Sequence, residues 1–256
     1  MVSGADKAGV FRALHHGRAP DDPLVLPGPW DAASARVLEE AGFPALATPS
    51  AGVAASLGYE DGATPAEEMF AAVARIVRAV DVPVSADVEG GYGLPPKELV
   101  ERLLETGAVG CNLEDSDAEG VLEDPRRHAD RLAEVRDAAG GRLFVNARID
   151  TFVRGIADPA AAVERAVLYV AAGADCVYPI GAPVDVLPLL RSGIQGPLNV
   201  HGTVTGGGPS PAGLGALGAT RITFGPGLQG AAARALRGIA DGLARAAPST
   251  PPAILD

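Results

Sequence analysis

The chain has few of the features that would associate it with nucleic acid or with a membrane. It has only two lysines, Lys7 and Lys97, and a formal net charge of −11, so no basic patch offsets the repulsion from phosphate groups. No segment resembles a signal peptide, and none is apolar over the roughly 20 residues needed to cross a bilayer. These absences argue against nucleic-acid and membrane partners, and they predict a soluble cytoplasmic protein.

Cysteine is scarce as well. Cys111 and Cys176 each begin an apolar segment, which is typical of buried free thiols and not of a disulfide or a zinc site. With so little lysine, the binding of an anionic group would depend on arginine, on helix N-termini or on a metal ion.

What the sequence does contain is one repeated pattern, in which a short apolar run is followed by a polar break and an alanine-rich helical segment. The runs predict strands at residues 24–29, 45–49, 82–88, 110–114, 143–149, 175–179, 197–200 and 220–224. Helices are predicted at 32–41, 65–80, 95–106, 125–139, 159–172, 184–190, 211–217 and 228–246. Proline near the start of several helices and glycine at the end of others support these boundaries.

Eight alternating strands and helices imply parallel strands with right-handed crossovers. In a chain of this length they predict a single α/β domain, a (β/α)8 TIM-type barrel over residues 24–246. The alternative is an open doubly wound sheet, but no Gly-x-Gly-x-x-Gly follows the first strand. Residues 1–23 are expected to add a short helix against the barrel bottom or a neighbouring subunit, and residues 247–256 a flexible tail.

In such a barrel the active site lies at the C-terminal ends of the strands. The third strand runs into VSADVEGGYG, which places Asp87 and Glu89 one residue apart, and the fourth strand ends at Glu114. Three carboxylates with no lysine nearby would repel one another, and a divalent cation would remove that cost. Oxygen ligands without paired His or Cys favour Mg²⁺ or Mn²⁺. Alternatively, the acids only cap the helices that follow.

Arg148 lies deep in an otherwise apolar strand, on the same alternating face as Asn146 and Asp150. A buried arginine requires a partner. That partner is either a structural salt bridge to Glu114 or Asp150, or a substrate carboxylate or enolate oxygen beside the metal, and the two roles are compatible.

Other polar residues at strand ends are less specific. Ser50-Ala51-Gly52 follows the second strand, where its backbone N–H groups could bind a carboxylate or simply form a tight turn. Asp61 lies in a loop that could cover the site or only make a turn. The seventh strand ends at Asn199 and His201; His201 is a candidate acid or base, although a lone loop histidine often has no special role.

Taken together, these segments resemble the isocitrate lyase and phosphoenolpyruvate mutase superfamily. The resemblance runs from about Phe11 to Ala246 and is carried by PGPWDAASAR, TPSAGVAASLGYEDG, SADVEGGYG, NLEDS, NARID and PLNV. It implies a (β/α)8 barrel that binds Mg²⁺ and acts on 2-oxo and 2-hydroxy acids.

The resemblance also implies roles for individual residues. Asp87, Glu89 and Glu114 match the metal shell, with Glu89 in place of the more usual aspartate. Ser50, Ala51 and Gly52 match the segment that binds the substrate carboxylate, and Arg148 matches the arginine that binds carboxylate or enolate oxygens. Asp61 matches an acid near the metal, Trp30 matches the aromatic wall, and Asn199 in PLNV is a further candidate for substrate binding.

Two departures from the lyases bear on the substrate. Their mobile loop with Lys-Lys/Arg-Cys-Gly-His is replaced by the acidic SDAEGVLEDPRRH, and their Phe-Pro-Glu after strand six is replaced by the sequence YPIG, residues 178–181. We therefore do not expect this protein to use the tricarboxylate and dicarboxylate substrates of isocitrate and methylisocitrate lyases. We expect its substrate to be a different 2-oxo acid.

The sequence thus predicts an enzyme that cleaves or forms a C–C bond of a small 2-oxo or 2-hydroxy acid through a metal-bound enolate. Retro-aldol cleavage and oxaloacetate-type hydrolysis remain open, and His128, Asp124, Tyr59 and His201 are equal candidates for proton transfer. Rearrangement of a C–P bond is a second hypothesis, and a non-catalytic protein that binds metal and oxyacid is a third. A homo-oligomer, dimer or tetramer, is expected from the family, although a single long helix after strand eight argues against full exchange of that helix.

Overall fold

The strands form two parallel sheets in the computed structural model, which describes residues 4–117 and 119–246. One sheet has the order β2-β3-β4-β5-β6 and the other the order β1-β8-β7. The strands are β1 (Leu24–Val25), β2 (Leu46–Ala47), β3 (Val84–Asp87), β4 (Gly110–Glu114), β5 (Phe144–Ile149), β6 (Cys176–Pro179), β7 (Asn199–His201) and β8 (Arg221–Thr223). Each of the eight predicted strands is present, several of them shorter than predicted, and every ladder between them is parallel, as the alternation of elements predicted.

Single backbone contacts, and not continuous ladders, join the two sheets. Between β6 and β7, Val177 forms an isolated parallel bridge with Leu198. Between β1 and β2, the Ala47 N–H donates to the Pro27 carbonyl at 3.2 Å. The predicted α/β architecture with parallel strands is therefore confirmed, but the ladders themselves do not run without interruption around all eight strands.

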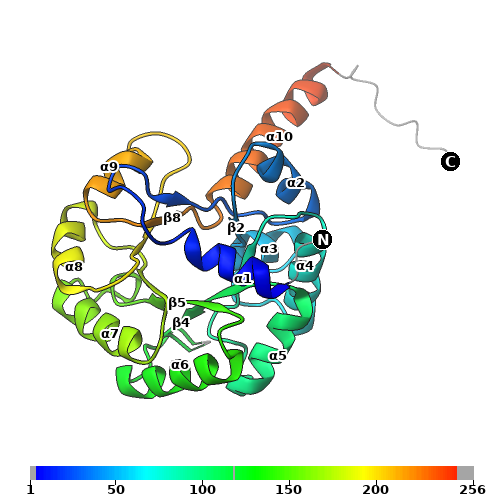
Figure 1. Ribbon diagram of the computed structural model, residues 1–256. Helices are drawn as coiled ribbons and strands as arrows, with labels where there is room; N and C mark the ends of the chain where they lie inside the picture. Colours follow the sequence, from blue (N-terminus) through cyan, green and yellow to red (C-terminus); the bar gives the residue numbers. More distant parts are fainter. Residues whose placement is uncertain (1–3, 118, 247–256) are drawn as a thin grey trace.

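Helices surround the strands on the outside of the molecule (Figure 1). The helices are α1 (Gly4–Ala13), α2 (Ala32–Glu40), α3 (Ser50–Leu57), α4 (Ala66–Arg78), α5 (Pro96–Thr106), α6 (Pro125–Ala139), α7 (Pro159–Ala171), α8 (Leu187–Gly193), α9 (Pro211–Ala216) and α10 (Gly227–Ala246). Pro125 begins α6, where its missing N–H has no intrahelical partner to lose. Gly107 ends α5 at φ 82°, a conformation that favours glycine. The largest core cluster lies between the strands and this helical layer.

Helix α3 is the element that the sequence did not predict. Residues 50–52 are not a tight turn, because they form its first turn. Gly52 serves close packing here, since a Cβ at this position would lie 2.9 Å from Cγ of Pro49. The chain therefore presents a helix N-terminus, and not a loop, at the end of β2.

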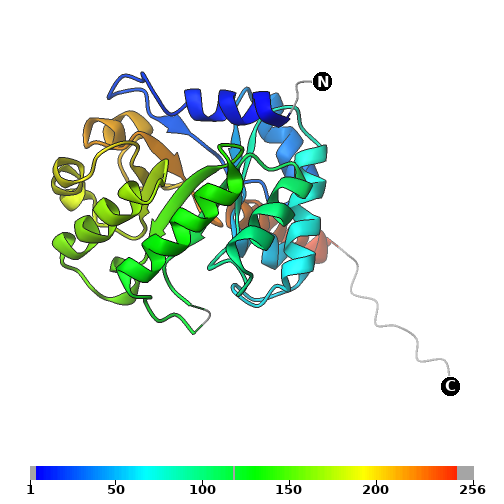
Figure 2. The same cartoon turned by 60° about the horizontal axis from the view of Figure 1, so that its bottom comes forward.

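Helix α1 packs against the N-terminal ends of the strands (Figure 2). Phe11 is fully buried, with its ring 5.2 Å from that of Phe144 at the start of β5. Arg12 donates to the carboxylate of Asp175 at 3.1 Å. The helix predicted within residues 1–23 is thus present and ends at Ala13, while the predicted tail, 247–256, lies outside the described residues. Across the described ranges, no helix combines the length and apolarity needed to span a bilayer.

Candidate active site

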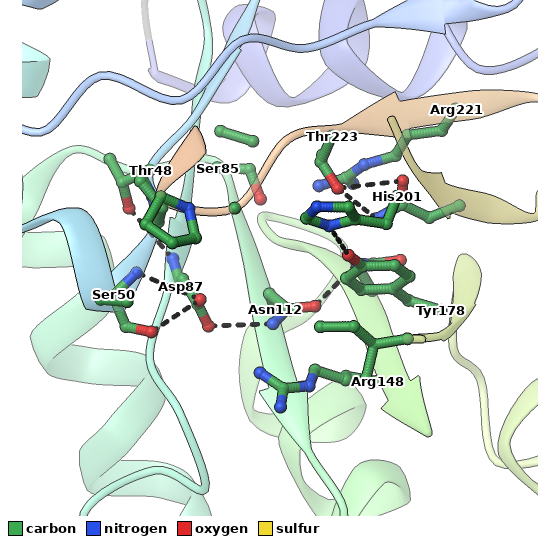
Figure 3. A pocket seen from close by; sticks show the side chains of 18 of the residues that line it. Thr48, Ser50, Ser85, Asp87, Asn112, Arg148, Tyr178, His201, Arg221 and Thr223 are labelled. Atoms are coloured by element: carbon green, nitrogen blue, oxygen red, sulfur yellow. Dashed lines mark hydrogen bonds between the residues drawn. The ribbon is translucent and has the colours of Figure 1, made fainter. Parts of the chain in front are cut away.

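Polar side chains from several strands meet in one cavity of about 180 Å³, here called the strand-end cavity (Figure 3). Its polar lining residues are Thr48, Ser50, Asp61, Ser85, Asp87, Asn112, Asn146, Arg148, Tyr178, Asn199, His201, Arg221 and Thr223. Alternation along each strand explains the set, because residues two apart, such as Ser85 and Asp87, point to the same side of a strand. The sequence-predicted residues that line this cavity are Ser50, Ala51, Asp61, Asp87, Arg148, Asn199 and His201.

Asp87 is fixed by a chain of hydrogen bonds. Its Oδ2 accepts from the Ser50 N–H at 3.2 Å and from the Ser50 hydroxyl at 2.9 Å. Its Oδ1 accepts from Nδ2 of Asn112 at 2.9 Å, and Asn112 in turn accepts from Nδ2 of Asn146 at 2.8 Å. Asp87 therefore lies at the N-terminus of α3, where the helix dipole favours a negative charge. Because the Ser50 N–H is already used, Ala51 and Gly52 hold the free N–H groups of this turn, and Pro49 caps neither.

Arg148, on β5, pairs with Glu114 directly across from it on β4 and donates from Nε to Asp150 at 2.6 Å. Burial lowers the pKa of the guanidinium, but Glu114 and Asp150 outweigh that effect and raise it. The side chain thus remains charged. Arg148 thus forms the structural salt bridges considered from the sequence and also lines the strand-end cavity.

A second cavity of about 480 Å³, here called the loop cavity, shares Asp61 and Arg148 with the first. Glu89 and Glu114 line it. Burial and Asp87 raise the pKa of Glu89 to about 7, and the same two causes raise the pKa of Glu114 to about 8. Burial and Asp87 also raise the pKa of Asp61. Negative charge is therefore crowded at this end of the strands.

Glu89 is held in a strained position within that acidic group. Its backbone has φ 51°, unusual for a residue other than glycine, and its Oε1 is buried without a hydrogen-bond partner. No group of three or more His, Cys, Asp or Glu side chains among the described residues could hold a metal ion by itself. Asp87, Glu89 and Glu114 would therefore need ligands from elsewhere to complete a metal site.

His201 lies at the end of β7 and contacts Tyr178, whose hydroxyl is 3.1 Å from Nδ1 of the imidazole. Desolvation and the charge on Arg148 lower the pKa of His201. Burial raises the pKa of Tyr178 to about 12. Asn199 precedes His201 by two residues on β7, and it donates from Nδ2 to the Thr223 hydroxyl at 3.1 Å.

Several predicted residues lie outside both cavities. His128 is not in a loop, because α6 begins at Pro125; its ring is 1% exposed and packs 5.0 Å from that of Tyr169. Asp124 caps the same helix by accepting from the N–H of Arg126 at 2.9 Å.

The other predicted residues outside the cavities lie near α3 and α4. Tyr59 donates to Glu68 at 2.5 Å, away from the cavities. Trp30 packs beside Gly52, behind the first turn of α3, and neither residue lines a cavity.

The sequence analysis did not single out some residues of the strand-end cavity. Asn112 and Ser85 were read as part of apolar strands, and Arg221 and Thr223 were not considered. A pattern in the sequence could have identified three of them, because Asn112, Arg221 and Thr223 alternate with apolar neighbours along their strands.

Comparisons with known proteins agree with this geometry. The phosphoenolpyruvate phosphomutase family matches residues 11–244. An uncharacterized protein of Mycobacterium tuberculosis (strain ATCC 25618 / H37Rv) is 36% identical over 91% of this chain and 89% of its own.

Solved structures show the same likeness. One, from Burkholderia cenocepacia J2315 and assigned only provisionally as a phosphonomutase, has a TM-score of 0.85 and 38% identity, over 92% of this chain and 99% of its own. A 2,3-dimethylmalate lyase has a TM-score of 0.82 and 27% identity, over 100% and 92% of the two chains. The chain belongs to the phosphoenolpyruvate phosphomutase family, within the superfamily of phosphoenolpyruvate mutase and isocitrate lyase.

Proposed function

We propose that the protein cleaves or forms a carbon–carbon bond of a small 2-oxo or 2-hydroxy acid through an enolate, with Mg²⁺ or Mn²⁺ as cofactor. The observation that carries this proposal is the position of Arg148, a charged guanidinium that lines both cavities among carboxylates. Membership of the family and the likeness to a 2,3-dimethylmalate lyase support it. Retro-aldol cleavage and oxaloacetate-type hydrolysis are both compatible with such a site.

We further propose that the two sheets together form one (β/α)8 barrel. The bridge between Val177 and Leu198 and the hydrogen bond from Ala47 to Pro27 lie at the two places where the ladders stop. Strands β1 and β2, on either side of one junction, have only two residues each, and these residues pair with β8 and β3 respectively.

The acidic residues fit a hard divalent cation. Asp61, Asp87, Glu89 and Glu114 offer only oxygen ligands, Oε1 of Glu89 is buried without a partner, and the raised pKa values indicate more negative charge than Arg148 offsets. Asp87, Glu89 and Glu114 would hold the ion, directly or through the waters that Mg²⁺ usually retains. When bound, the ion would supply positive charge beside the oxygen on which the enolate develops.

The remaining interactions with the substrate come from the chain itself. Arg148 binds a carboxylate or enolate oxygen by charge-assisted hydrogen bonds, and the N–H group of Ala51, which lines the strand-end cavity, orients the carboxylate at the N-terminus of α3. Preorganised donors of this kind are commonly the largest catalytic contribution, and loss of one can cost about 3 kcal/mol.

For proton transfer we propose His201, with Asp61 as the second group. Among the four histidine, tyrosine and aspartate candidates from the sequence, His201 is the one that lines the strand-end cavity. Its lowered pKa keeps the imidazole neutral at pH 7, so that it can accept a proton. Asp61 lies between the two cavities and has a raised pKa, which favours its carrying a proton.

Rearrangement of a C–P bond is the second candidate function. The loop after β4 has lost the cations of its relatives, but Arg131 and Arg154 line the loop cavity from α6 and from the segment after β5. Their charge could bind the phosphonate group that such chemistry requires. A protein that only binds the metal and an oxyacid is the third candidate.

The test is an assay of the purified protein with MgCl₂ against a panel of 2-oxo acids, 2-hydroxy acids and phosphonopyruvate. A carbonyl product identifies a lyase, release of oxalate or acetate a hydrolase, and loss of phosphonopyruvate a mutase. Tight oxalate binding without any turnover identifies a binding protein.

A binding experiment tests the site itself. Arg148→Ala and Glu114→Ala are expected to weaken oxalate binding and its dependence on Mg²⁺, whereas Arg142→Ala, in the turn before β5, serves as the matched control. If oxalate affinity and its Mg²⁺ dependence are the same in all these variants, the site is misplaced.

A further inference from the structure

Arg221, on β8, is a buried arginine that the proposed reaction leaves without a role. It is 1% exposed and stands in register with Asn199 on β7 and Leu24 on β1. It lines the strand-end cavity, and in Figure 3 it lies beside Thr223 and His201, on the far side of Tyr178 from Arg148. The two arginines thus reach one cavity from different strands.

Arg221 differs from two arginines of this fold that are only partly buried. Arg148 pairs with Glu114 and Asp150, and Arg165 pairs with Asp115. The Nε and Nη1 atoms of Arg221, by contrast, are buried without a hydrogen-bond partner, and no Asp or Glu oxygen of the described residues is within ion-pair distance of it. Three of its five N–H donors, one on Nε and two on Nη1, are therefore free to bind a ligand.

The ionisable groups around Arg221 do not neutralise it. Its neighbours Cys176, Cys111 and Tyr178 are uncharged at neutral pH, because burial raises the pKa of each to about 12. His15 is uncharged as well, because burial and the charge of Arg221 lower its pKa to about 3. The carboxylate of Asp87 accepts its hydrogen bonds from Ser50 and Asn112 instead. A buried charge without compensation is strongly unfavourable, so this guanidinium gains more than any other in the cavity from an anionic ligand.

We infer that Arg221 binds a second carboxylate of the substrate, so that the acid taken by this site is a dicarboxylate whose two ends reach Arg148 and Arg221. The inference rests on the proposed function, which places the first carboxylate or the enolate at Arg148 and at the N-terminus of α3. A guanidinium holds a carboxylate through two parallel hydrogen bonds, which makes it selective for that group over a methyl group of similar size. Oxaloacetate is a 2-oxo acid of this class, and its cleavage is one of the reactions that the proposed function includes.

The experiment compares pairs of acids that differ only in a terminal methyl or carboxylate group. Isothermal titration calorimetry with fixed MgCl₂ measures 2-hydroxybutyrate against malate, and 2-hydroxyvalerate against 2-hydroxyglutarate. The wild type is expected to bind the dicarboxylate of at least one pair tenfold or more tightly than its monocarboxylate partner. In Arg221→Met we expect this tenfold advantage, which corresponds to about 1.4 kcal/mol, to disappear. The affinity of the variant for the monocarboxylate should stay within about twofold of the wild-type value.

Two further variants control for folding and for the loss of any arginine. Arg221→Gln keeps a polar side chain without the charge, and it is expected to lose the same advantage if Arg221→Met fails to fold. Arg191→Met removes an arginine near the N-terminal ends of β7 and β8, outside the strand-end cavity, and is expected to keep the wild-type preference.

The results separate the inference from the proposal beneath it. The second carboxylate site is refuted if the wild type binds the monocarboxylates and binds neither dicarboxylate more tightly than its monocarboxylate partner. It is also refuted if both Arg221 variants keep the preference for the dicarboxylate. In either case the proposed function stands. If the wild type binds neither member of either pair, the proposed function fails and the inference falls with it.

Discussion

The hydroxyl oxygen of Tyr178, on β6, lies 3.1 Å from Nδ1 of His201, on β7, and both side chains line the strand-end cavity. This contact orients the imidazole toward the position proposed for the substrate. We expect His201→Ala to lower kcat by about 100-fold, the lower end of general acid–base effects, with little change in KM. Tyr178→Phe keeps the ring and removes only the hydrogen bond, so its loss should be smaller. Both are measured with the acid of the panel that is turned over; an unchanged kcat in His201→Ala would rule out its role.

The pH dependence of the reaction follows from the same histidine. Desolvation and Arg148 lower the pKa of His201 below its usual 6.5, so the neutral imidazole persists at lower pH than in water. Activity that needs this neutral form is expected to be retained as the pH falls through 6.5 and to be lost only below the lowered pKa. A profile of kcat/KM against pH tests this, and an acidic limb at or above pH 6.5 would contradict it.

Addition of MgCl₂ is expected to raise the melting temperature of the protein, and EDTA is expected to reverse the shift. The cation would relieve the repulsion among Asp87, Glu89 and Glu114, which burial intensifies. A ligand at 100 times its Kd stabilises the folded state by about 2.7 kcal/mol. Glu89→Gln and Glu114→Gln should each reduce the Mg²⁺-dependent shift, whereas Glu101→Gln, on the surface of α5, should not. The absence of any shift in the wild type would refute the proposed metal site.

His128 is expected to make the protein sensitive to acid. Burial and the nearby charges of Arg131 and Arg165 lower its pKa to about 3, from about 6.5 in the unfolded chain. The unfolded state therefore binds the proton first, and stability is lost as the pH falls from about 6.5 toward 3. At pH 4 the loss would be about 3 kcal/mol.

Urea unfolding of His128→Phe at pH 7 and pH 4 tests this origin of the acid sensitivity. Phenylalanine keeps the contact with Tyr169 and cannot be protonated, so the difference in stability between the two pH values should shrink. His16→Phe, in the segment after α1, serves as a control. An equal pH dependence in the wild type and in His128→Phe would show that other groups are responsible.

Helix α10 carries an exposed apolar face that favours self-association. Leu236, Ile239 and Leu243 lie on one face of the helix and are 66%, 61% and 68% exposed, and the helix extends away from the strands (Figure 1). We expect a homo-oligomer, dimer or tetramer, by light scattering coupled to gel filtration. Replacement of the three residues by serine should shift it toward the monomer, whereas Arg237→Ser should not. A monomeric wild type would refute this expectation.

The parts of the site that follow from strand periodicity could be predicted from the sequence. Asp87, Arg148 and His201 stand where a strand meets its loop, and alternation alone places such residues on the inner side of parallel strands. His128 could not be placed in this way. The sequence predicts the helix that carries it, 125–139, but whether the imidazole faces solvent or Tyr169 depends on how α6 packs against α7.

By itself, the sequence determined the order and type of the strands and of the helices other than α3. It also determined the parallel pairing and the acidic strand ends, because these depend on local periodicity and on the chirality of the crossovers. Only the tertiary structure decided which charges are paired. The register between β4 and β5 sets Glu114 opposite Arg148, while the register of β8 sets Asn199 and Leu24, and no acid, beside Arg221. Two arginines on strands thus have different electrostatic surroundings, since compensation of a buried charge depends on which residues the neighbouring strands bring within a few ångströms.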